Sequence, residues 1–148
     1  MFHIELHPTT HLPPQLLALE KEAAGQGFRF LTRLIAEWES GANRFDAPGE
    51  CLMAAYLNQQ LIGIGGLSVD PYSESHTARL RRVYVAASSR RQHVGRTLVK
   101  ALVAQAALHF QSVRLFTDTP EGDAFYVQCG FTRIEDVHAT HDMRLEDA

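Results

Sequence analysis

The spacing of apolar residues along the chain predicts most of its strands and helices. Residues 2–7 carry apolar side chains at positions 2, 4 and 6, as expected for a strand with one buried face. Two helices are predicted over residues 16–24 and 28–40, because prolines precede the first and Gly41 follows the second. Residues 51–57 and 61–69 are apolar almost throughout, which predicts two strands in a sheet that is covered on both sides.

The next predicted strand, residues 80–85, changes its apolar parity partway along. Apolar side chains fall at even positions up to Leu80 and at odd positions from Val83 onward. Because successive side chains of a strand point to opposite faces, one extra residue between them would return both sets to a common face. The pattern therefore predicts a β-bulge near Arg81 or Arg82.

The remaining elements are predicted from helix signals and short apolar runs. A polar turn over residues 86–93 leads into a helix that begins near Val94 and carries a broad apolar stripe. After a short strand at 112–117, Thr119 and Pro120 are expected as the N-cap and first residue of another helix, which Gly130 ends. Residues 131–135 and 137–145 are expected to form a closing pair of strands. The fold class predicted is mixed α/β.

Composition and length narrow the possible classes of protein. At 148 residues, one domain spanning residues 1–148 is the simplest expectation. The formal net charge of −3 does not favour nucleic-acid binding, and no apolar run is long enough for a membrane span. Cys51 and Cys129 match no metal or redox spacing, and free thiols in a reducing compartment are expected. The expected location is therefore cytoplasmic.

Charge is distributed unevenly, and the most basic segment coincides with the turn before Val94. Seven of the 14 Lys and Arg residues lie between Arg79 and Lys100, and no Asp or Glu occurs from residue 75 to residue 117. The N-terminus of a helix offers unpaired backbone N–H groups and a positive dipole end to an anion. Gly95 has no Cβ to hold a ligand away from the backbone. The segment is therefore a candidate phosphate-binding turn, although a solvated basic surface is the plain alternative.

Two motifs resemble those of the GCN5-related N-acetyltransferases. Residues 85–98 are similar to the family's motif A, Arg/Gln-x-x-Gly-x-Gly/Ala, with Arg90 on its first position and Gly95 on its last. His93 stands where the family usually has its first glycine. Residues 124–131 resemble motif B, in which a tyrosine precedes a Gly-Phe pair, and Tyr126 occupies the position of that tyrosine.

The resemblance implies a fold, a co-substrate and a set of site residues. The implied fold is the GNAT acyl-CoA N-acyltransferase fold: a mostly antiparallel sheet with helices on both faces and a bulged fourth strand that splays from the fifth. The implied activity is acetyl transfer from acetyl-CoA to a primary amine of a small molecule or peptide, with Tyr126 protonating the leaving thiolate and no membrane or nucleic-acid partner. The residues implied to bind the cofactor are Val83, Tyr84, Val85, Arg90, Arg91, Gln92, His93, Val94, Gly95, Arg96, Thr97 and Thr119.

Several alternatives remain open from the sequence. The chain could be a non-catalytic acyl-CoA-binding or sensor module, and a homodimer is also possible. A dinucleotide-binding Rossmann domain is disfavoured, because no Gly-x-Gly-x-x-Gly follows a strand. A metal site at the histidines near the N-terminus is disfavoured as well, since alternation places them on the outer face of the first strand. The general base cannot be assigned; a water chain is one possibility, and the side-chain candidates are Glu37, Glu39, Asp70, His76 and Asp118.

Overall fold

The computed structural model describes residues 3–73, 76–90 and 92–145, and its elements follow the predicted order. The strands and helices, in chain order, are β1 (Ile4–Thr9), α1 (Leu16–Gly25), α2 (Phe30–Ser40), β2 (Cys51–Leu57), β3 (Gln60–Val69), β4 (Thr77–Val85), the 3₁₀ turn η1 (Ala87–Ser89), α3 (Val94–Ala107), β5 (Ser112–Leu115), α4 (Pro120–Gln128), β6 (Thr132–Arg133) and β7 (His141–Arg144).

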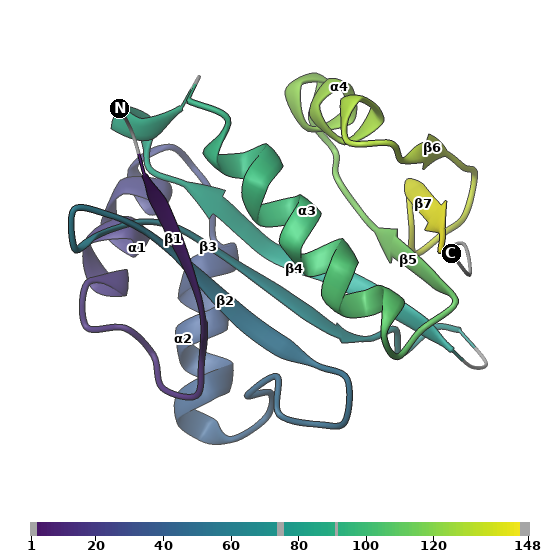
Figure 1. The fold of residues 1–148 in the computed structure, drawn as a ribbon, viewed down its shortest axis with the longest axis horizontal. Helices are drawn as coiled ribbons and strands as arrows, with labels where there is room; N and C mark the ends of the chain where they lie inside the picture. Colours follow the sequence, from purple (N-terminus) through teal and green to yellow (C-terminus); the bar gives the residue numbers. More distant parts are fainter. Residues whose placement is uncertain (1–2, 74–75, 91, 146–148) are drawn as a thin grey trace.

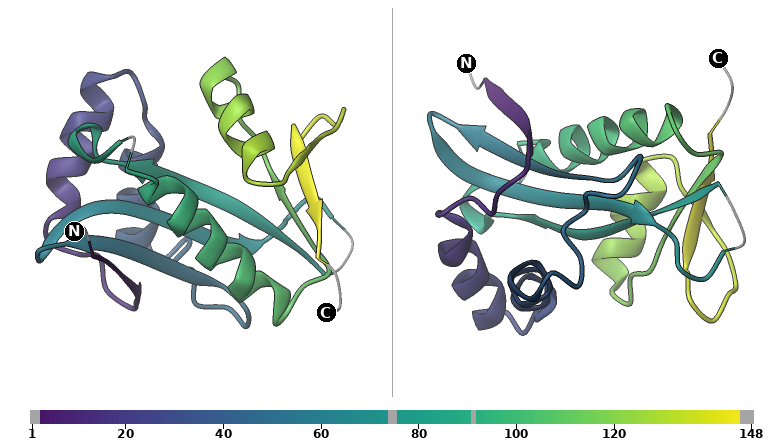
Figure 2. Two further views of the ribbon diagram at one scale, coloured as in Figure 1. Left: turned by 45° about the horizontal axis from the view of Figure 1, so that its top comes forward. Right: turned by 90° about the horizontal axis from the view of Figure 1, so that it is seen from below.

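The strands form one mixed sheet in the order β1-β2-β3-β4-β5-β7-β6. Every neighbouring pair is antiparallel except β4 and β5, which are parallel and joined through α3. Helices α1 and α2 cover one face of the sheet, and α3 lies across the other (Figures 1 and 2). This arrangement confirms the predicted mixed, mostly antiparallel sheet with helices on both faces.

Each face of the sheet has its own buried cluster. Beneath α1 and α2, the buried side chains of Leu16, Leu31 and Leu34 pack against β2 and β3. On the opposite face, Leu98 and Leu102 of α3 pack against β3 and β4. Complete burial of such a side chain stabilises the fold by about 1.5–3 kcal/mol. The two helical layers therefore hold β4, the strand that leads into the basic turn, from both sides.

The last two strands are shorter than the sequence pattern predicts. Residues 134–140 instead form a turn, in which the backbone N–H of His138 donates to Asp136 at 2.8 Å and that of Ile134 donates to the carbonyl of Thr140 at 2.9 Å. The Ile134–Thr140 bond directly follows the last paired residues, Arg133 and His141, and closes the turn at the point where the two strands end. Within the described residues, none of the helices has the length and apolar character needed to cross a membrane.

Candidate active site

The parallel strands β4 and β5 are held together only at one end. Their paired residues are Thr77 with Ser112, Ala78 with Val113, and Arg79 with Arg114, and the pairing stops there. Beyond Arg79, β4 continues to Val85 while the chain after β5 turns toward α4, so that a gap opens between them (Figure 1). This confirms the splayed fourth strand that the family resemblance implies.

A buried carboxylate fixes the closed end of this gap. The side chain of Asp70 is fully buried; its Oδ1 lies 3.3 Å from Nη1 of Arg79, and its Oδ2 lies 3.6 Å from Nη1 of Arg114. These two arginines are opposite each other across the β4–β5 pair, so one carboxylate neutralises a cation from each strand. Ser73 also donates its hydroxyl to Asp70. Asp70 was a candidate base, but these contacts give it a structural role.

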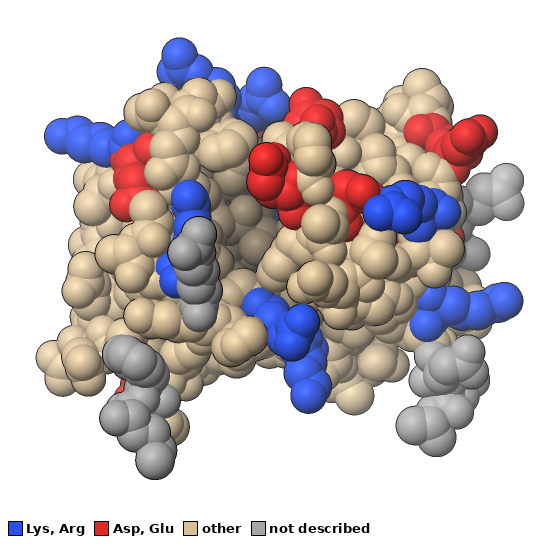
Figure 3. All heavy atoms as spheres, turned by 90° about the horizontal axis from the view of Figure 1, so that it is seen from above, with Lys and Arg blue, Asp and Glu red and all other residues tan. Residues whose placement is uncertain are grey.

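The open end of the gap leads to a hollow on the surface. Figure 3 views the molecule from this end and shows a depression near the centre of the face, with Asp and Glu side chains on one side of it and Lys and Arg side chains on the other side and below. Phe116, the residue directly after β5, is 53% exposed. An aromatic side chain left exposed beside a gap in a sheet is suited to contact a bound molecule, and the sequence pattern did not single it out.

The predicted bulge lies in β4 at Arg82. Ile64 pairs with Tyr84 and Gly66 pairs with Arg81, so two residues of β4, Arg82 and Val83, face only Gly65 of β3. Arg82 has a positive φ of 61°, which accommodates the extra residue. Val83 packs against the same buried cluster as Leu80, so the bulge has returned both to one face. The bulge predicted from the change in apolar parity is therefore confirmed.

The basic turn enters α3 through a residue in the left-handed conformation. His93 is the residue before α3 and has φ 61° and ψ 20°, values that glycine adopts without steric cost. The backbone turn is thus retained although a histidine replaces the family's glycine. The first turn of α3 contains no acidic residue, and no side chain of the described residues caps it. Its backbone N–H groups are therefore available to an anion.

Gly95 is required for packing within the protein. A Cβ at this position would lie 3.1 Å from Cζ of Phe125 on α4 and 3.5 Å from Val85 on β4. The absence of a side chain therefore lets α4 approach the start of α3. This is a reason for glycine beyond the expected approach of a ligand to the backbone.

A glutamate of α1 holds the start of the basic turn. Glu22 accepts a hydrogen bond from the hydroxyl of Tyr84, and its Oε2 accepts the backbone N–H of Ala87 at 2.9 Å. The hydrogen bond from Tyr84 is the main reason why the pKa of Glu22 lies below its ordinary value. Burial and the bond to Glu22 in turn raise the pKa of Tyr84 to about 12. Sequence reasoning missed this contact, because α1 carries no motif.

The three arginines expected to bind phosphates have different surroundings. Arg90 folds back onto the protein: its Nε donates to the carbonyl of Val85 at 3.1 Å, and its Nη2 donates to Gln26, just after α1, at 3.2 Å. Arg96 is exposed in the first turn of α3. Arg91 lies outside the described residues. Of Arg90 and Arg96, the two that the structure describes, Arg96 is exposed to solvent and makes no described hydrogen bond to the protein.

Helix α4 begins as its sequence predicts. Thr119 is the N-cap, and its Oγ1 accepts the backbone N–H of Gly122 at 3.0 Å. A Cβ at Gly122 would collide with Oγ1 of Thr117 and would lie 2.9 Å from Oγ1 of Thr119, so only glycine fits here. The Thr119 oxygen is thus engaged as an acceptor within the helix, and its hydroxyl proton remains available for a ligand.

Tyr126 lies in the middle of an aromatic group. Its ring centroid is 4.9 Å from that of Phe125, 5.8 Å from that of Phe131 and 6.3 Å from that of His141. The ring packs against the same buried cluster as Val83 of the bulge. Burial, with a smaller effect of Cys129, raises the pKa of Tyr126 above its ordinary value. The phenol therefore stays protonated at neutral pH.

An acidic residue of α4 fastens this helix to the end of the sheet. Asp123 accepts hydrogen bonds from Arg133 at 2.7 and 2.9 Å and lies 2.8 Å from Nε2 of the buried His141. Arg133 and then His141 lower the pKa of Asp123 to about 2. These contacts fix the orientation of α4 and hence of Tyr126. No sequence motif indicated them.

The remaining candidate bases are distributed over three places. Glu37 of α2 accepts a hydrogen bond from Nη2 of Arg82 at 2.9 Å, which brings its carboxylate to the bulge. Glu39 and Asp118 are exposed, and so is His76, which has a positive φ of 55° just before β4. Among these four residues, Glu37 has a described contact with the bulge itself.

The two cysteines do not resemble acyl carriers. Cys51 and Cys129 are free and half-buried. Burial raises the pKa of the Cys51 thiol to about 11 and also raises that of Cys129. Since the thiolate is the nucleophile, both thiols are poorly suited to form a thioester.

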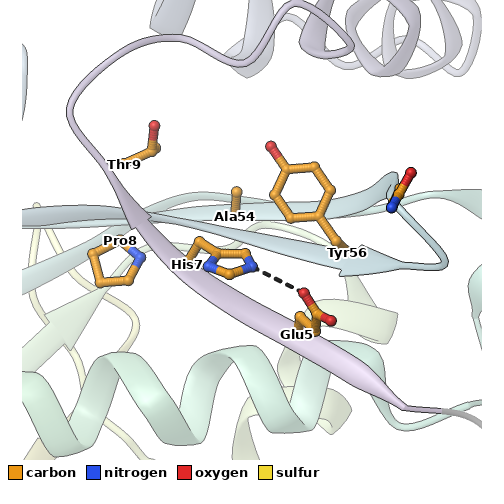
Figure 4. A pocket seen from close by; sticks show the side chains of 7 residues that line it. Glu5, His7, Pro8, Thr9, Ala54 and Tyr56 are labelled. Carbon is orange, nitrogen blue, oxygen red and sulfur yellow. Dashed lines mark hydrogen bonds and ion pairs between the residues drawn. The ribbon is translucent and has the colours of Figure 1, made fainter.

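A second hollow lies on the outer part of the sheet, away from the gap. It has a volume of about 360 Å³ and is lined by residues of β1 and β2, among them Glu5, His7 and Tyr56 (Figure 4). Nε2 of His7 lies 3.2 Å from Oε2 of Glu5. Within the described parts of the chain, no three His, Cys, Asp or Glu side chains are grouped so that they could bind a metal ion.

Comparison with solved structures shows the same fold in many proteins. A structure assigned as an acetyltransferase from Exiguobacterium sp. 255-15 matches with a TM-score of 0.87 and 22% identity, over 96% of this chain and 93% of that one. An acetyltransferase from Streptococcus agalactiae 2603 matches with a TM-score of 0.72 and 18% identity, over 94% and 95%. The GNAT family N-acetyltransferase YhbS from Escherichia coli, solved in complex with CoA, matches with a TM-score of 0.68 and 15% identity, over 99% and 84%. At these identities the likeness establishes the fold.

The family follows from the sequence itself. A search among curated proteins finds no match to this chain. The model of the acetyltransferase (GNAT) family matches residues 15–131, which include α1, the bulged strand, the basic turn and α4. The chain belongs to the GNAT family of acetyltransferases.

Proposed function

We propose that this protein transfers the acetyl group of acetyl-CoA to a primary amine by direct attack of the amine on the thioester. The observation that carries the proposal is the gap between β4 and β5, which has a bulge on one side, a helix N-terminus at its mouth and a partly buried tyrosine on α4. Such an arrangement can accommodate an extended thioester between two strands. Anionic groups of the same molecule would then meet the positive end of α3.

The residues of the basic turn fit the phosphates of CoA. The segment is free of acidic residues, α3 starts without a side-chain cap among the described residues, and Arg96 is exposed in its first turn. Backbone N–H groups at this position bind phosphate oxygens, and an exposed arginine adds a cation that can bind two oxygens. The left-handed backbone at His93 forms the turn through which the chain enters α3.

The chemistry requires an oxyanion donor and a proton donor. The nitrogen lone pair of the neutral amine forms a bond to the thioester carbon, and the backbone N–H of Val83, at the bulge, stabilises the resulting oxyanion. The carbon–sulfur bond then breaks, and the hydroxyl of Tyr126 gives its proton to the departing thiolate. Its raised pKa supports this role, since the phenol is protonated beforehand.

The nitrogen must also lose a proton. Glu37 is the candidate that contacts the bulge residue Arg82, and its side chain is 34% exposed. A carboxylate in this position can accept the proton directly or through one water molecule. No covalent enzyme intermediate is needed, in keeping with the raised thiol pKa values of both cysteines.

Two measurements test the proposal. Calorimetry should show that acetyl-CoA binds and that Arg96→Ala weakens the binding, less so at high salt because an exposed charge is screened. Arg33→Ala, which removes an exposed arginine from α2, is the matched control and should leave the affinity unchanged. Thiol release with a panel of primary amines then distinguishes an enzyme from a sensor module. Tight binding without acetylation of any amine would favour the sensor.

A further inference from the structure

A polar hollow lies beside the bulge, between the C-terminal part of α2 and strands β3 and β4. Its volume is about 410 Å³, within the range of pockets that hold small molecules. The residues that line it come from α2, from the loop between α2 and β2, from the end of β3 and from the middle of β4. The polar residues that matter for its chemistry are Glu37, Arg44, Asp46, Glu50, Ser68 and Arg81.

Arg81 is a half-buried cation without a counterion. Among the described residues it makes neither an ion pair nor a hydrogen bond. Burial lowers its pKa, and the positive charges of Arg82 and Arg79 lower it further, with partial compensation by Glu37. A guanidinium nevertheless remains charged in proteins, so an anion bound here would remove an unfavourable concentration of positive charge.

The neighbouring polar groups indicate where such an anion would be bound. Arg81 pairs with Gly66 of β3, two residues before Ser68, and the buried hydroxyl of Ser68 lacks a hydrogen-bond partner within the described structure. Nε of Arg82 is likewise buried and unpartnered there. Two polar groups that line the hollow, Arg81 and Ser68, therefore lack a partner among the described residues, and the unpartnered Nε of Arg82 follows directly in the chain. Buried polar groups without partners are costly in a folded protein unless a ligand completes them.

Most of the other charges around the hollow are already engaged. Nε of Arg44 donates to the carbonyl of Trp38 at 2.8 Å. The two carboxylate oxygens of Glu50 accept the backbone N–H groups of Ala47 at 3.1 Å and Val69 at 2.8 Å. Two carboxylates of the lining are accessible to a ligand: Asp46 is exposed, and Glu37 is 34% exposed although its Oε1 accepts a hydrogen bond from Arg82. The hollow therefore offers a cation on β4 that has no ion-pair partner among the described residues, together with carboxylates from α2 and from the loop that follows it.

Its position relates it to the proposed reaction. Arg81 lies two residues beyond Arg79, where the β4–β5 pairing ends, and directly before the bulge. An amine bound near Glu37 would therefore be close to the backbone N–H of Val83. A group on the other end of the same molecule would lie against Arg81.

We propose that the acceptor is a small amino acid-like molecule, whose carboxylate binds Arg81 and whose amine faces Glu37. This inference rests on the proposed acetyl transfer and specifies its substrate class. An amine without an anionic group would leave Arg81 uncompensated, and a nucleophile without an amine would make no use of the carboxylates.

Matched acceptor pairs test the inference in the wild-type protein. Each pair consists of an amino acid and its carboxamide, which differ in charge but hardly in shape. The acids should be acetylated with a kcat/KM roughly 10- to 100-fold higher than the carboxamides, the range expected for hydrogen bonds to a charged group. Arg81→Met removes the cation and keeps the apolar stem. It should raise KM for the acids by a similar factor, whereas KM for the carboxamides should change by less than about twofold. The control variant Arg33→Met should change KM for neither class of acceptor.

The outcomes separate this inference from the proposed function. Equal rates for acids and carboxamides, or an Arg81→Met effect that is the same for both, would overturn the amino acid-like acceptor and leave acetyl transfer intact. If the protein binds acetyl-CoA but acetylates neither the acids nor the carboxamides, the amino acid-like acceptor is also overturned. Failure to bind acetyl-CoA would reject the proposed function itself. Should the variant not fold, the comparison within the wild-type protein decides the question.

Discussion

Replacing Asp70 by asparagine should loosen the closed end of the gap between β4 and β5. The Asp70 carboxylate is fully buried and is shared by Arg79 and Arg114, whose side chains are only 12% and 16% exposed. The substituted amide would keep the shape and an acceptor oxygen but lose the charge that neutralises two cations from adjacent strands. Removing one partner of a buried ion pair costs about 3–5 kcal/mol, because the remaining charge is left buried and uncompensated.

The expected loss is a large fraction of the stability of a domain, which is typically about 5–15 kcal/mol. It corresponds to a decrease in melting temperature of roughly 6–20 °C for a chain of this size. Urea unfolding followed by circular dichroism measures the free energy directly, with the slope checked for constancy between variants. Acetyl-CoA affinity should fall as well, since Asp70 fixes the separation of the strands that border the proposed cleft.

Asp136→Asn provides a matched control. Asp136 contacts the same Arg114, with Oδ2 2.9 Å from Nη2, but its side chain is 37% exposed. Exposed ion pairs contribute little because water solvates both partners, so this variant should lose far less stability than Asp70→Asn. If both substitutions reduce the free energy of unfolding equally, or if neither does, Asp70 does not fasten the two strands.

Three further predictions concern the turn and the chemistry. Tyr126→Phe should bind acetyl-CoA as the wild type does, but its pre-steady-state acetyl transfer should be roughly 100-fold slower, the usual effect of losing a proton donor; an unchanged rate would leave Tyr126 with a packing role. His93→Gly should stabilise the fold by about 0.5–1 kcal/mol in urea unfolding, because glycine adopts the left-handed backbone at φ 61° without steric strain. The greater flexibility of glycine in the unfolded chain offsets part of this gain. A loss of stability would indicate that the imidazole makes a favourable contact. Glu22→Gln should destabilise the protein at neutral pH, and the difference from wild type should shrink as the pH falls. Folding lowers the pKa of Glu22 from its ordinary value of 4.5, so the ionised carboxylate stabilises the fold fully above pH 4.5. This stabilisation is lost as the pH falls from 4.5 through the lower pKa of the folded state. A difference between the two proteins that does not depend on pH would exclude this charge effect.

Sequence reasoning predicted those features that depend on local rules. The bulge in β4 followed from a change in apolar parity, because side chains must alternate between the faces of a strand and both sets had to reach the same core. The start of α4 followed from Thr119 and Pro120, because an N-cap requires only residues within one turn of each other. The left-handed residue at position 93 fits the position at which the family places glycine.

The family motifs also identified the candidate phosphate turn and the tyrosine of α4, but not the contacts that hold them in place. Glu22 reaches Tyr84 and Ala87 although both are distant in the sequence. Arg90 was expected to bind a phosphate, yet its guanidinium lies against the carbonyl of Val85 and the amide of Gln26. Neither arrangement could be deduced from spacing, since α1 has an amphipathic pattern that many surface helices share.

The sequence by itself thus determined the order of the elements, the bulge, and the two segments that belong to the family's motifs, since hydrophobic alternation and capping operate between near neighbours. The tertiary structure decided which charges are neutralised inside the protein and which remain available. Asp70 changed from a turn residue and candidate base to the buried link between two strands, whereas Arg81 was left without a counterion among the described residues, beside a hollow. The physical reason is that the fate of a charged group depends on burial and on partners brought from distant elements, and both exist only after the sheet and its helices have assembled.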